Sequence, residues 1–314
     1  MLGCLDIMKK LLIIALLCSF VFCAFAAEEV QNHFIPLAGM KYVQTDSDDY
    51  LLSPSGGLQY MRIMPESRVF SLAANSSYNY YHRGFGEDGV KSFHGVSLMS
   101  SYNSGKNSFT AMIGSQGEVP FSDIKTVSGA LIYCRQIVQN DNFTFIFGGG
   151  LVAADFDLTI NDFDLYVLPV PVFSLGYKNS WLNSSLSFMG APTLHIVLFP
   201  NAMFRFDGTA ALAGVKSARD ISFDCALKVY PFINTKAGEL VGFSAGVMNS
   251  SDSFILKNKD EYGLQYYCAY GEVSATFITL RCGYNFNGVK LLNKEITDDL
   301  YNGIYASASA MLYF

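Results

Sequence analysis

Residues 221–230 read ISFDCALKVY, and this stretch decides the fold. Its odd-numbered residues are apolar, whereas its even-numbered residues include Ser222, Asp224 and Lys228. A strand places alternate residues on opposite faces, while a helix scatters them around its axis. The same period of two recurs in Phe204–Leu212, Val241–Met248, Tyr262–Tyr270 and Tyr305–Phe314. We therefore predict an all-β protein.

The composition of the chain points to a membrane rather than to water. Hydrophobic residues make up 51% of the chain and charged residues 15%. After residue 26, no stretch approaches the run of about 20 apolar residues that a spanning helix needs. In lipid every backbone polar group must be bonded internally, so the other spanning structure is a closed barrel. We predict an antiparallel up-and-down transmembrane β-barrel. The alternative is an exported β-sandwich, whose solvated faces need more charged residues than this chain has.

The start of the chain predicts export. The basic pair Lys9-Lys10 precedes an apolar run that ends in the small-x-small sequence Ala24-Phe25-Ala26. This order is typical of a cleaved secretory signal peptide. We therefore predict a signal peptide over residues 1–26 and a single barrel domain over residues 27–314. The alternatives are an uncleaved membrane anchor and a lipoprotein anchor.

Polar stretches divide the chain into predicted strands. Hairpin turns rich in Asn, Gly and Ser are expected at residues 103–107, 140–142, 178–181 and 234–238. Longer polar stretches are expected to form outer loops at residues 46–57, 83–91, 249–261 and 291–302, the last with a short helix over Asn293–Tyr301. With roughly 10 residues per strand plus connections, we predict about 12 strands, in the range of about 10–14.

Charge and cysteine usage exclude several function classes. Loss of residues 1–26 changes the formal net charge from −6 to −7, and no Lys/Arg cluster is present, which excludes nucleic acid as a partner. The four cysteines outside this segment have no metal-binding spacing, so we predict no metal and no cofactor. Their patterning favours single cysteines on strand faces over two disulfides, which three connectivities would allow. They are Cys134, Cys225, Cys268 and Cys282.

The last ten residues, YASASAMLYF, alternate and end on an aromatic residue. With Leu312 and the terminal Phe314, this strand resembles the C-terminal signal of bacterial outer-membrane β-barrels, which the barrel-assembly machinery recognises. The resemblance implies that the chain lies in the outer membrane of a Gram-negative bacterium. It also implies that outer-membrane lipid and the assembly machinery are partners of the chain.

Two internal stretches resemble narrower families. Residues 166–188, YVLPVPVFSLGYKNSWLNSSLSF, place a Leu-Pro-x-Pro strand before a turn and a Trp-led strand. This layout is similar to that of an uncharacterised family of outer-membrane barrels described only by a domain of unknown function. Residues 278–288, ITLRCGYNFNG, resemble the penultimate strands of FadL-type transporters. That resemblance implies transport of hydrophobic solutes.

Charged residues on strands are the candidate site. A charge facing lipid is costly, so charged strand residues are expected to line the lumen. The candidates are Arg205, Asp207, Asp224, Lys228 and Arg281. Small residues predicted on the same inner surface leave room for a narrow pathway: Gly148, Gly150, Gly242, Gly246 and Ala269. We predict a passive or hydrophobic-solute channel. The alternative is a closed barrel whose inner charges pair and which acts through its loops.

An enzyme remains a competing hypothesis. His195 is expected to face inward, with Ser185 or Ser187 on the neighbouring strand, as a Ser/His hydrolase acting on lipid would require. Serine is abundant in this chain, so a serine near some histidine is expected by chance. A structural or interfacial role for the histidines is favoured, and we predict that the protein is not an enzyme.

Overall fold

A computed structural model shows the fold of the chain. The signal-peptide prediction and the terminal Phe314 lie outside the described residues. The part of the chain that is described contains no helix long and apolar enough to cross a membrane. The described residues are 30–45, 49–85, 90–118, 123–155, 158–159, 162–163, 166–189, 191–212, 221–235, 238–255, 261–292 and 295–312.

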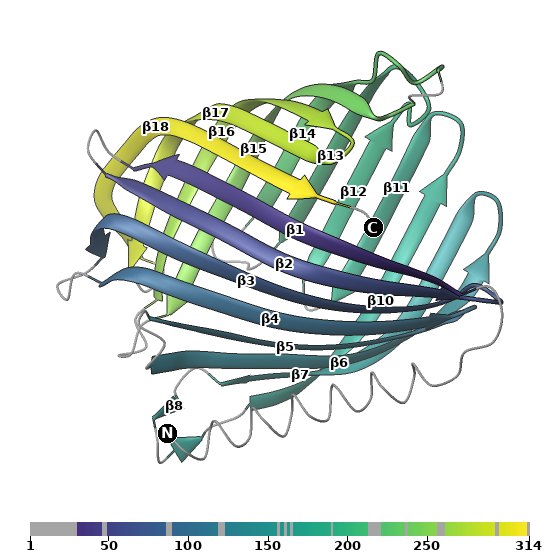
Figure 1. The fold of residues 1–314 in the computed structure, drawn as a ribbon, viewed down its shortest axis with the longest axis horizontal. Helices are drawn as coiled ribbons and strands as arrows, with labels where there is room; N and C mark the ends of the chain where they lie inside the picture. The colour runs from purple at the N-terminus through teal and green to yellow at the C-terminus, as the bar shows by residue number, and fades with distance from the viewer. Residues whose placement is uncertain are drawn as a thin grey trace.

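Sixteen strands of the described chain close into one antiparallel barrel. Each strand pairs with its neighbours in sequence, and the first pairs with the last, so that the yellow β18 lies beside the purple β1 (Figure 1). The barrel strands are β1 (Gln31–Gln44), β2 (Tyr50–Met64), β3 (Arg68–Phe85), β4 (Val90–Ser104), β5 (Asn107–Glu118), β6 (Asp123–Gln139), β7 (Phe143–Asp155), β10 (Tyr166–Lys178), β11 (Leu182–Met189), β12 (Pro192–Leu198), β13 (Phe204–Leu212), β14 (Ile221–Val229), β15 (Val241–Ile255), β16 (Glu261–Ala275), β17 (Ile278–Leu292) and β18 (Glu295–Met311). A small hairpin of β8 (Leu158–Thr159) and β9 (Asp162–Phe163) lies between β7 and β10 in the chain.

The predicted all-β antiparallel barrel is confirmed, but the predicted number of strands is wrong. The chain forms sixteen barrel strands in its described part, not about twelve. Much of the sequence that was expected to form outer loops is strand: β2 starts at Tyr50, and β15 continues to Ile255. Polar side chains do not end these strands, because the backbone N–H and C=O groups of the polar residues form hydrogen bonds with the neighbouring strand.

The predicted short helix over Asn293–Tyr301 is also wrong. Residues 295–311 form β18, and Tyr301 pairs with Gly288 of β17. Pairing along the neighbouring strand satisfies the backbone over the whole length of β18, whereas a one- or two-turn helix would leave most of its own backbone groups unpaired. Tertiary pairing therefore overrides the local helical pattern here.

Short turns connect strands at one end of the barrel, as the sequence predicts at residues 103–107, 140–142 and 178–181. The fourth predicted turn, at residues 234–238, lies partly outside the described residues, in the longer connection between β14 and β15. In two of the short turns an asparagine carboxamide closes the turn. Asn140 Oδ1 accepts hydrogen bonds from the backbone N–H groups of Asn142 and Phe143, and Asn179 Oδ1 does the same for the turn after β10. We call this end, where β2 leads to β3, the turn end, and the opposite end, where β1 leads to β2, the loop end.

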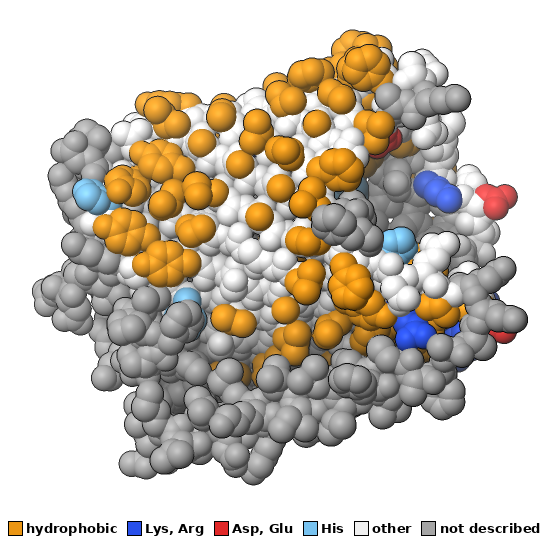
Figure 2. Space-filling view, viewed as in Figure 1, with side chains coloured by type: hydrophobic (Ala, Val, Ile, Leu, Met, Phe, Trp, Pro, Cys, Tyr) orange, Lys and Arg blue, Asp and Glu red, His pale blue; other side chains and the backbone are white. Residues whose placement is uncertain are grey.

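The outer surface of the barrel is apolar. Side chains on the odd-numbered positions of β14 face outward, and Leu227 is 66% exposed. On β13 the outward side chain of Phe204 is 65% exposed. Figure 2 shows hydrophobic side chains spread over this surface, with charged side chains gathered near its right-hand rim. A broad exposed apolar surface is the lipid-facing side of a transmembrane barrel.

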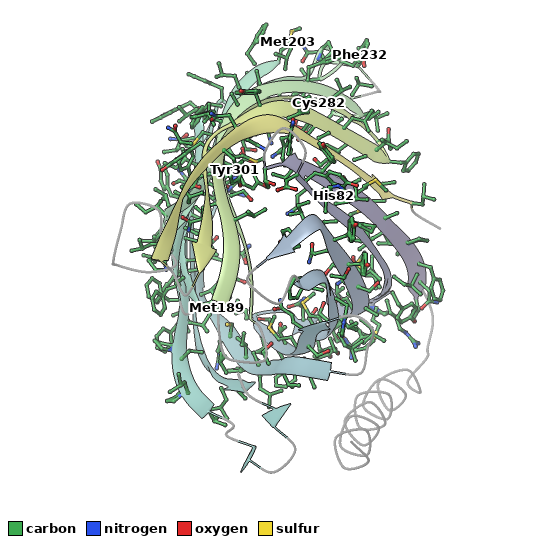
Figure 3. The ribbon with its side chains drawn as sticks, turned by 90° about the vertical axis from the view of Figure 1, so that its left-hand side faces the viewer. His82, Met189, Met203, Phe232, Cys282 and Tyr301 are labelled. Carbon is green, nitrogen blue, oxygen red and sulfur yellow. The ribbon has the colours of Figure 1, made fainter. Side chains whose placement is uncertain are left out.

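The inner surface changes character along the barrel. Toward the loop end it is packed with apolar and aromatic side chains, which we call the apolar cluster. Figure 3 shows one of them, Tyr301, on the inner side of the ring of strands, whereas Met203 and Phe232 lie at its outer rim. The apolar cluster comprises Val43, Leu51, Tyr81, Phe93, Ala226, Met248, Leu264, Tyr266, Cys268, Tyr270, Tyr301 and Tyr305.

The four cysteines of the described chain are free thiols. Cys268 is buried in the apolar cluster, while Cys282 on the adjacent strand is exposed. Because β16 and β17 place these two side chains on different faces, they cannot approach one another for a disulfide. The patterned single cysteines favoured by the sequence are therefore present, and the two-disulfide alternative is not.

Candidate functional site: the lumen of the barrel

Ion pairs line the inner surface of β12 to β17 on the turn-end side of the apolar cluster, and we call this region the charged wall. Asp207 on β13 lies between two partners: its Oδ1 is 3.0 Å from His195 Nε2, and its Oδ2 accepts a hydrogen bond of 2.7 Å from Lys228 Nζ. Nearer the turn end, Arg205 donates to Glu239 Oε1 at 2.6 Å and lies over the ring of Tyr230, 4.2 Å from its centre. Each of these contacts joins inward side chains of neighbouring elements.

Arg281 on β17 is the centre of a second group of contacts. Its guanidinium donates to Glu272 Oε2 at 2.8 Å and to Asp224 Oδ2 at 3.0 Å. It also lies 3.9 Å from the centre of the Tyr270 ring, and the Tyr270 hydroxyl donates to Asp224. Because Tyr270 belongs to the apolar cluster, Arg281 links the charged wall to that cluster.

The charged wall is nearly balanced. In the contacts just described, the cations Arg205, Lys228 and Arg281 face the carboxylates of Asp207, Asp224, Glu239 and Glu272. His195 adds a further partner to Asp207. Each cation therefore has at least one carboxylate within hydrogen-bonding distance. A wall of this kind presents little uncompensated charge to a passing solute.

All five charged residues predicted to line the lumen, and His195, lie on the charged wall. Sequence reasoning missed Glu272, Glu239 and Tyr270. Glu272 follows Tyr270 by two residues and shares its face of β16, the face opposite the predicted lumen residue Ala269. The charge of Glu272, which is costly toward lipid, was the signal that this face is the inner one. Glu239 lies in the connection between β14 and β15, where no period of two exists to place its side chain.

The predicted lumen position of Ala269 is wrong. Ala269 pairs with Val247, whose side chain is 41% exposed on the outer surface. The neighbours Cys268 and Tyr270 face the lumen instead. Alternation separates two faces but does not say which face is inside, and here the larger side chains pack inward. The four glycines expected in the lumen, Gly148, Gly150, Gly242 and Gly246, lie on inward positions of β7 and β15.

A cavity of about 910 Å³ lies in the lumen. It is bounded mainly by β1 to β6, and it continues onto β16, β17 and β18. Small polar side chains line it on β2 to β6, and larger apolar side chains, among them Leu37, Leu240 and Phe277, line it elsewhere. We call the polar side chains on β2 to β6 the hydroxyl wall: Ser55, Asn75, Ser77, Ser97, Gln116 and Ser128.

Strand pairing makes the hydroxyl wall continuous. Asn75 pairs with Ser97, which in turn lies beside Gly114 of β5, and Gly114 pairs with Ser128 of β6. One step nearer the loop end, Ser55 pairs with Ser77 in the same way. Glycine and serine side chains extend only a short way into the lumen, so space for the cavity remains between the strands.

His195 and a serine also come together. Ser185 of β11 is the direct cross-strand partner of His195, and His195 Nε2 contacts Asp207. Among the hydrogen bonds of the described residues, none joins the imidazole to a serine. The lumen thus holds the three residue types of a hydrolase without the Ser–His hydrogen bond that activates the nucleophile. The described residues contain no group of His, Cys, Asp and Glu side chains able to hold a metal ion.

The sequence matches no protein-family model and no curated protein. Solved structures with a similar fold include OpdK, an outer membrane protein of Pseudomonas aeruginosa, with a TM-score of 0.37 and 8% identity over 90% of this chain and 99% of that chain. BamA from Haemophilus ducreyi lacking POTRA domains 1–3 has a TM-score of 0.39 and 9% identity over 90% and 70%. OccAB3 of Acinetobacter baumannii has a TM-score of 0.35 and 7% identity over 92% and 100%. At this level of identity and TM-score, the likeness carries no conclusion about this chain.

Proposed function

We propose that the protein is a passive channel for small solutes in a bacterial outer membrane. The observation that carries this proposal is the cavity of about 910 Å³ inside a closed barrel with an apolar exterior. A barrel of this size has more interior than its side chains need to fill, which is the condition for an aqueous pathway. The balanced charged wall supports passage of solutes without strong retention.

Single-channel recording tests the proposal. The chain from residue 27 onward is refolded with lipid, and heat-modifiable mobility on a gel checks that the barrel has formed. Discrete current steps in a planar bilayer are the expected result. A folded protein that inserts and stays silent would contradict an open channel and favour a closed barrel, in which the apolar cluster seals the lumen.

A lipid-modifying hydrolase is the second candidate, favoured by the placement of Ser185 opposite His195 and of Asp207 beside it. A serine-reactive fluorophosphonate probe distinguishes the two functions. We expect no labelling, because Asp207 already binds Lys228 and no hydrogen bond joins His195 to Ser185 in the described chain. Labelling that is lost in both Ser185→Ala and His195→Ala would establish the hydrolase instead.

A further inference from the structure

We infer that the cavity binds neutral, hydroxyl-rich solutes of the sugar or polyol class in preference to ions. This inference rests on the proposed channel function and names the solutes that the channel would take. It starts from the chemistry of the cavity lining. Apart from Glu239, the described residues that line the cavity carry no charged side chain.

The hydroxyl wall has unused hydrogen-bonding capacity. Ser71 and Ser101, nearer the turn end, bond to one another at 2.7 Å. By contrast, no hydrogen bond within the described residues involves the side chains of Ser55, Ser77 or Ser97. The same holds for the carboxamides of the wall, those of Asn75 and Gln116. These groups are therefore available to a solute or to the water that a solute displaces.

The available groups match hydroxyls better than charges. A serine hydroxyl both donates and accepts a hydrogen bond, and a carboxamide offers one acceptor oxygen and two donor hydrogens. A sugar hydroxyl has the same double character, so each contact can form in either direction. A free ammonium group only donates and a free carboxylate only accepts, so each would use half of this capacity.

The charges near the cavity give an ion no advantage. Glu239 pairs with Arg205 at 2.6 Å, so its charge is compensated within the protein. An ion that leaves water for this cavity loses hydration and gains no countercharge. A neutral polyol loses hydrogen bonds to water and regains them from the wall. The volume of about 910 Å³ lies within the range of roughly 300–1,000 Å³ that small-molecule sites occupy.

Titration calorimetry of the refolded protein in detergent tests the inference separately from conductance. Raffinose is the neutral probe, and gluconate and arginine are the charged probes. Binding of raffinose with higher affinity than either charged probe is the expected result. Equal binding of all three probes, tighter binding of a charged probe, or no binding of raffinose would each overturn the inference. The planar-bilayer recording tests the proposed channel function independently of solute binding.

A pair of variants on β4 locates the site. Ser97→Leu removes a hydroxyl from the cavity, whereas Ser100→Leu changes a serine of the same strand that faces outward beside Leu98. We expect Ser97→Leu to weaken raffinose binding about threefold to tenfold, the range that one neutral hydrogen bond supports. Ser100→Leu should leave it unchanged. If Ser97→Leu does not refold, Gln116→Leu replaces it, and unchanged binding in the folded variant would contradict the site.

Discussion

The charged wall and the hydroxyl wall line the same lumen and use polar side chains in opposite ways. On the charged wall each of Arg205, Lys228 and Arg281 is bound to a carboxylate of a neighbouring element. On the hydroxyl wall the serines make no hydrogen bonds to other side chains of the described residues. The difference follows from cost: a partly buried charge without a partner is expensive, while a hydroxyl is satisfied by water.

The largest expected effect comes from breaking the second group of ion pairs. Arg281→Ala leaves Asp224 and Glu272 without their cation, so we expect a loss of about 1–3 kcal/mol in the free energy of unfolding, less than for a fully buried pair because Asp224 is 40% exposed. Urea unfolding in lipid vesicles measures it. Arg68→Ala is the control, because its partner Glu66 is 81% exposed and the pair should contribute less than about 1 kcal/mol. Equal losses would show that the charged wall is not a connected unit.

A bulky side chain on the hydroxyl wall should narrow the pathway. An added Cβ at Gly114 meets nothing closer than 3.5 Å, so Gly114→Trp can extend its ring into the cavity. We expect the single-channel conductance to fall by roughly half, because a tryptophan side chain, with a surface area of roughly 150–250 Å², then narrows the lumen.

Gly271→Trp is the matched control for this substitution. Gly271 pairs with Cys282, which is exposed on the outer surface, and an added Cβ there meets its first neighbour at 4.0 Å. A conductance that falls equally in both variants would contradict the placement of the pathway beside the hydroxyl wall.

A charge reversal on the opposite wall should change selectivity more than conductance. Lys228→Glu removes the cation that Asp207 binds and adds a carboxylate beside it. The lumen then favours cations, and the reversal potential in a salt gradient should shift toward the potassium potential. Lys106→Glu, in the exposed turn between β4 and β5, is the control. An unchanged reversal potential in a folded Lys228→Glu protein would place the charged wall outside the pathway.

The smallest expected effect is a difference in the free energy of unfolding between two serine variants. Ser71→Ala breaks the 2.7 Å contact with Ser101 and should cost about 1 kcal/mol of stability. Ser97→Ala removes a hydroxyl that bonds to no other protein group in the described chain, so its effect should lie within roughly 0.5 kcal/mol of zero. Urea unfolding of the two variants separates these cases. A larger loss in Ser97→Ala would show that the hydroxyl wall is internally bonded.

The period of two was enough to predict the fold and much of the charged wall. Asp224 and Lys228 lie on the polar face of a strand whose other face is apolar, so their inward placement follows from one stretch of sequence. The strand number was not predictable in this way, because β2 and β15 continue through polar sequence. A strand ends where the neighbouring strand stops pairing with it. The polarity of the local sequence does not indicate that position.

Other features depended on contacts between distant residues. The hydroxyl wall consists of serines, one asparagine and one glutamine from separate strands, and nothing in their local sequence shows that they enclose one cavity. Glu239 lies in the connection between β14 and β15 and pairs with Arg205 of β13, and the orientation of Ala269 depends on which face of β16 is inside. Alternation gives two sets of side chains, whereas packing decides which set is inside.

Ion selectivity of the unmodified protein tests the account most directly. Recordings in a planar bilayer with unequal salt concentrations on the two sides give both the conductance and the reversal potential. An open lumen beside a compensated charged wall predicts discrete current steps and a cation-to-anion permeability ratio close to one. A silent protein that has folded and inserted, or a strongly selective current, would contradict it.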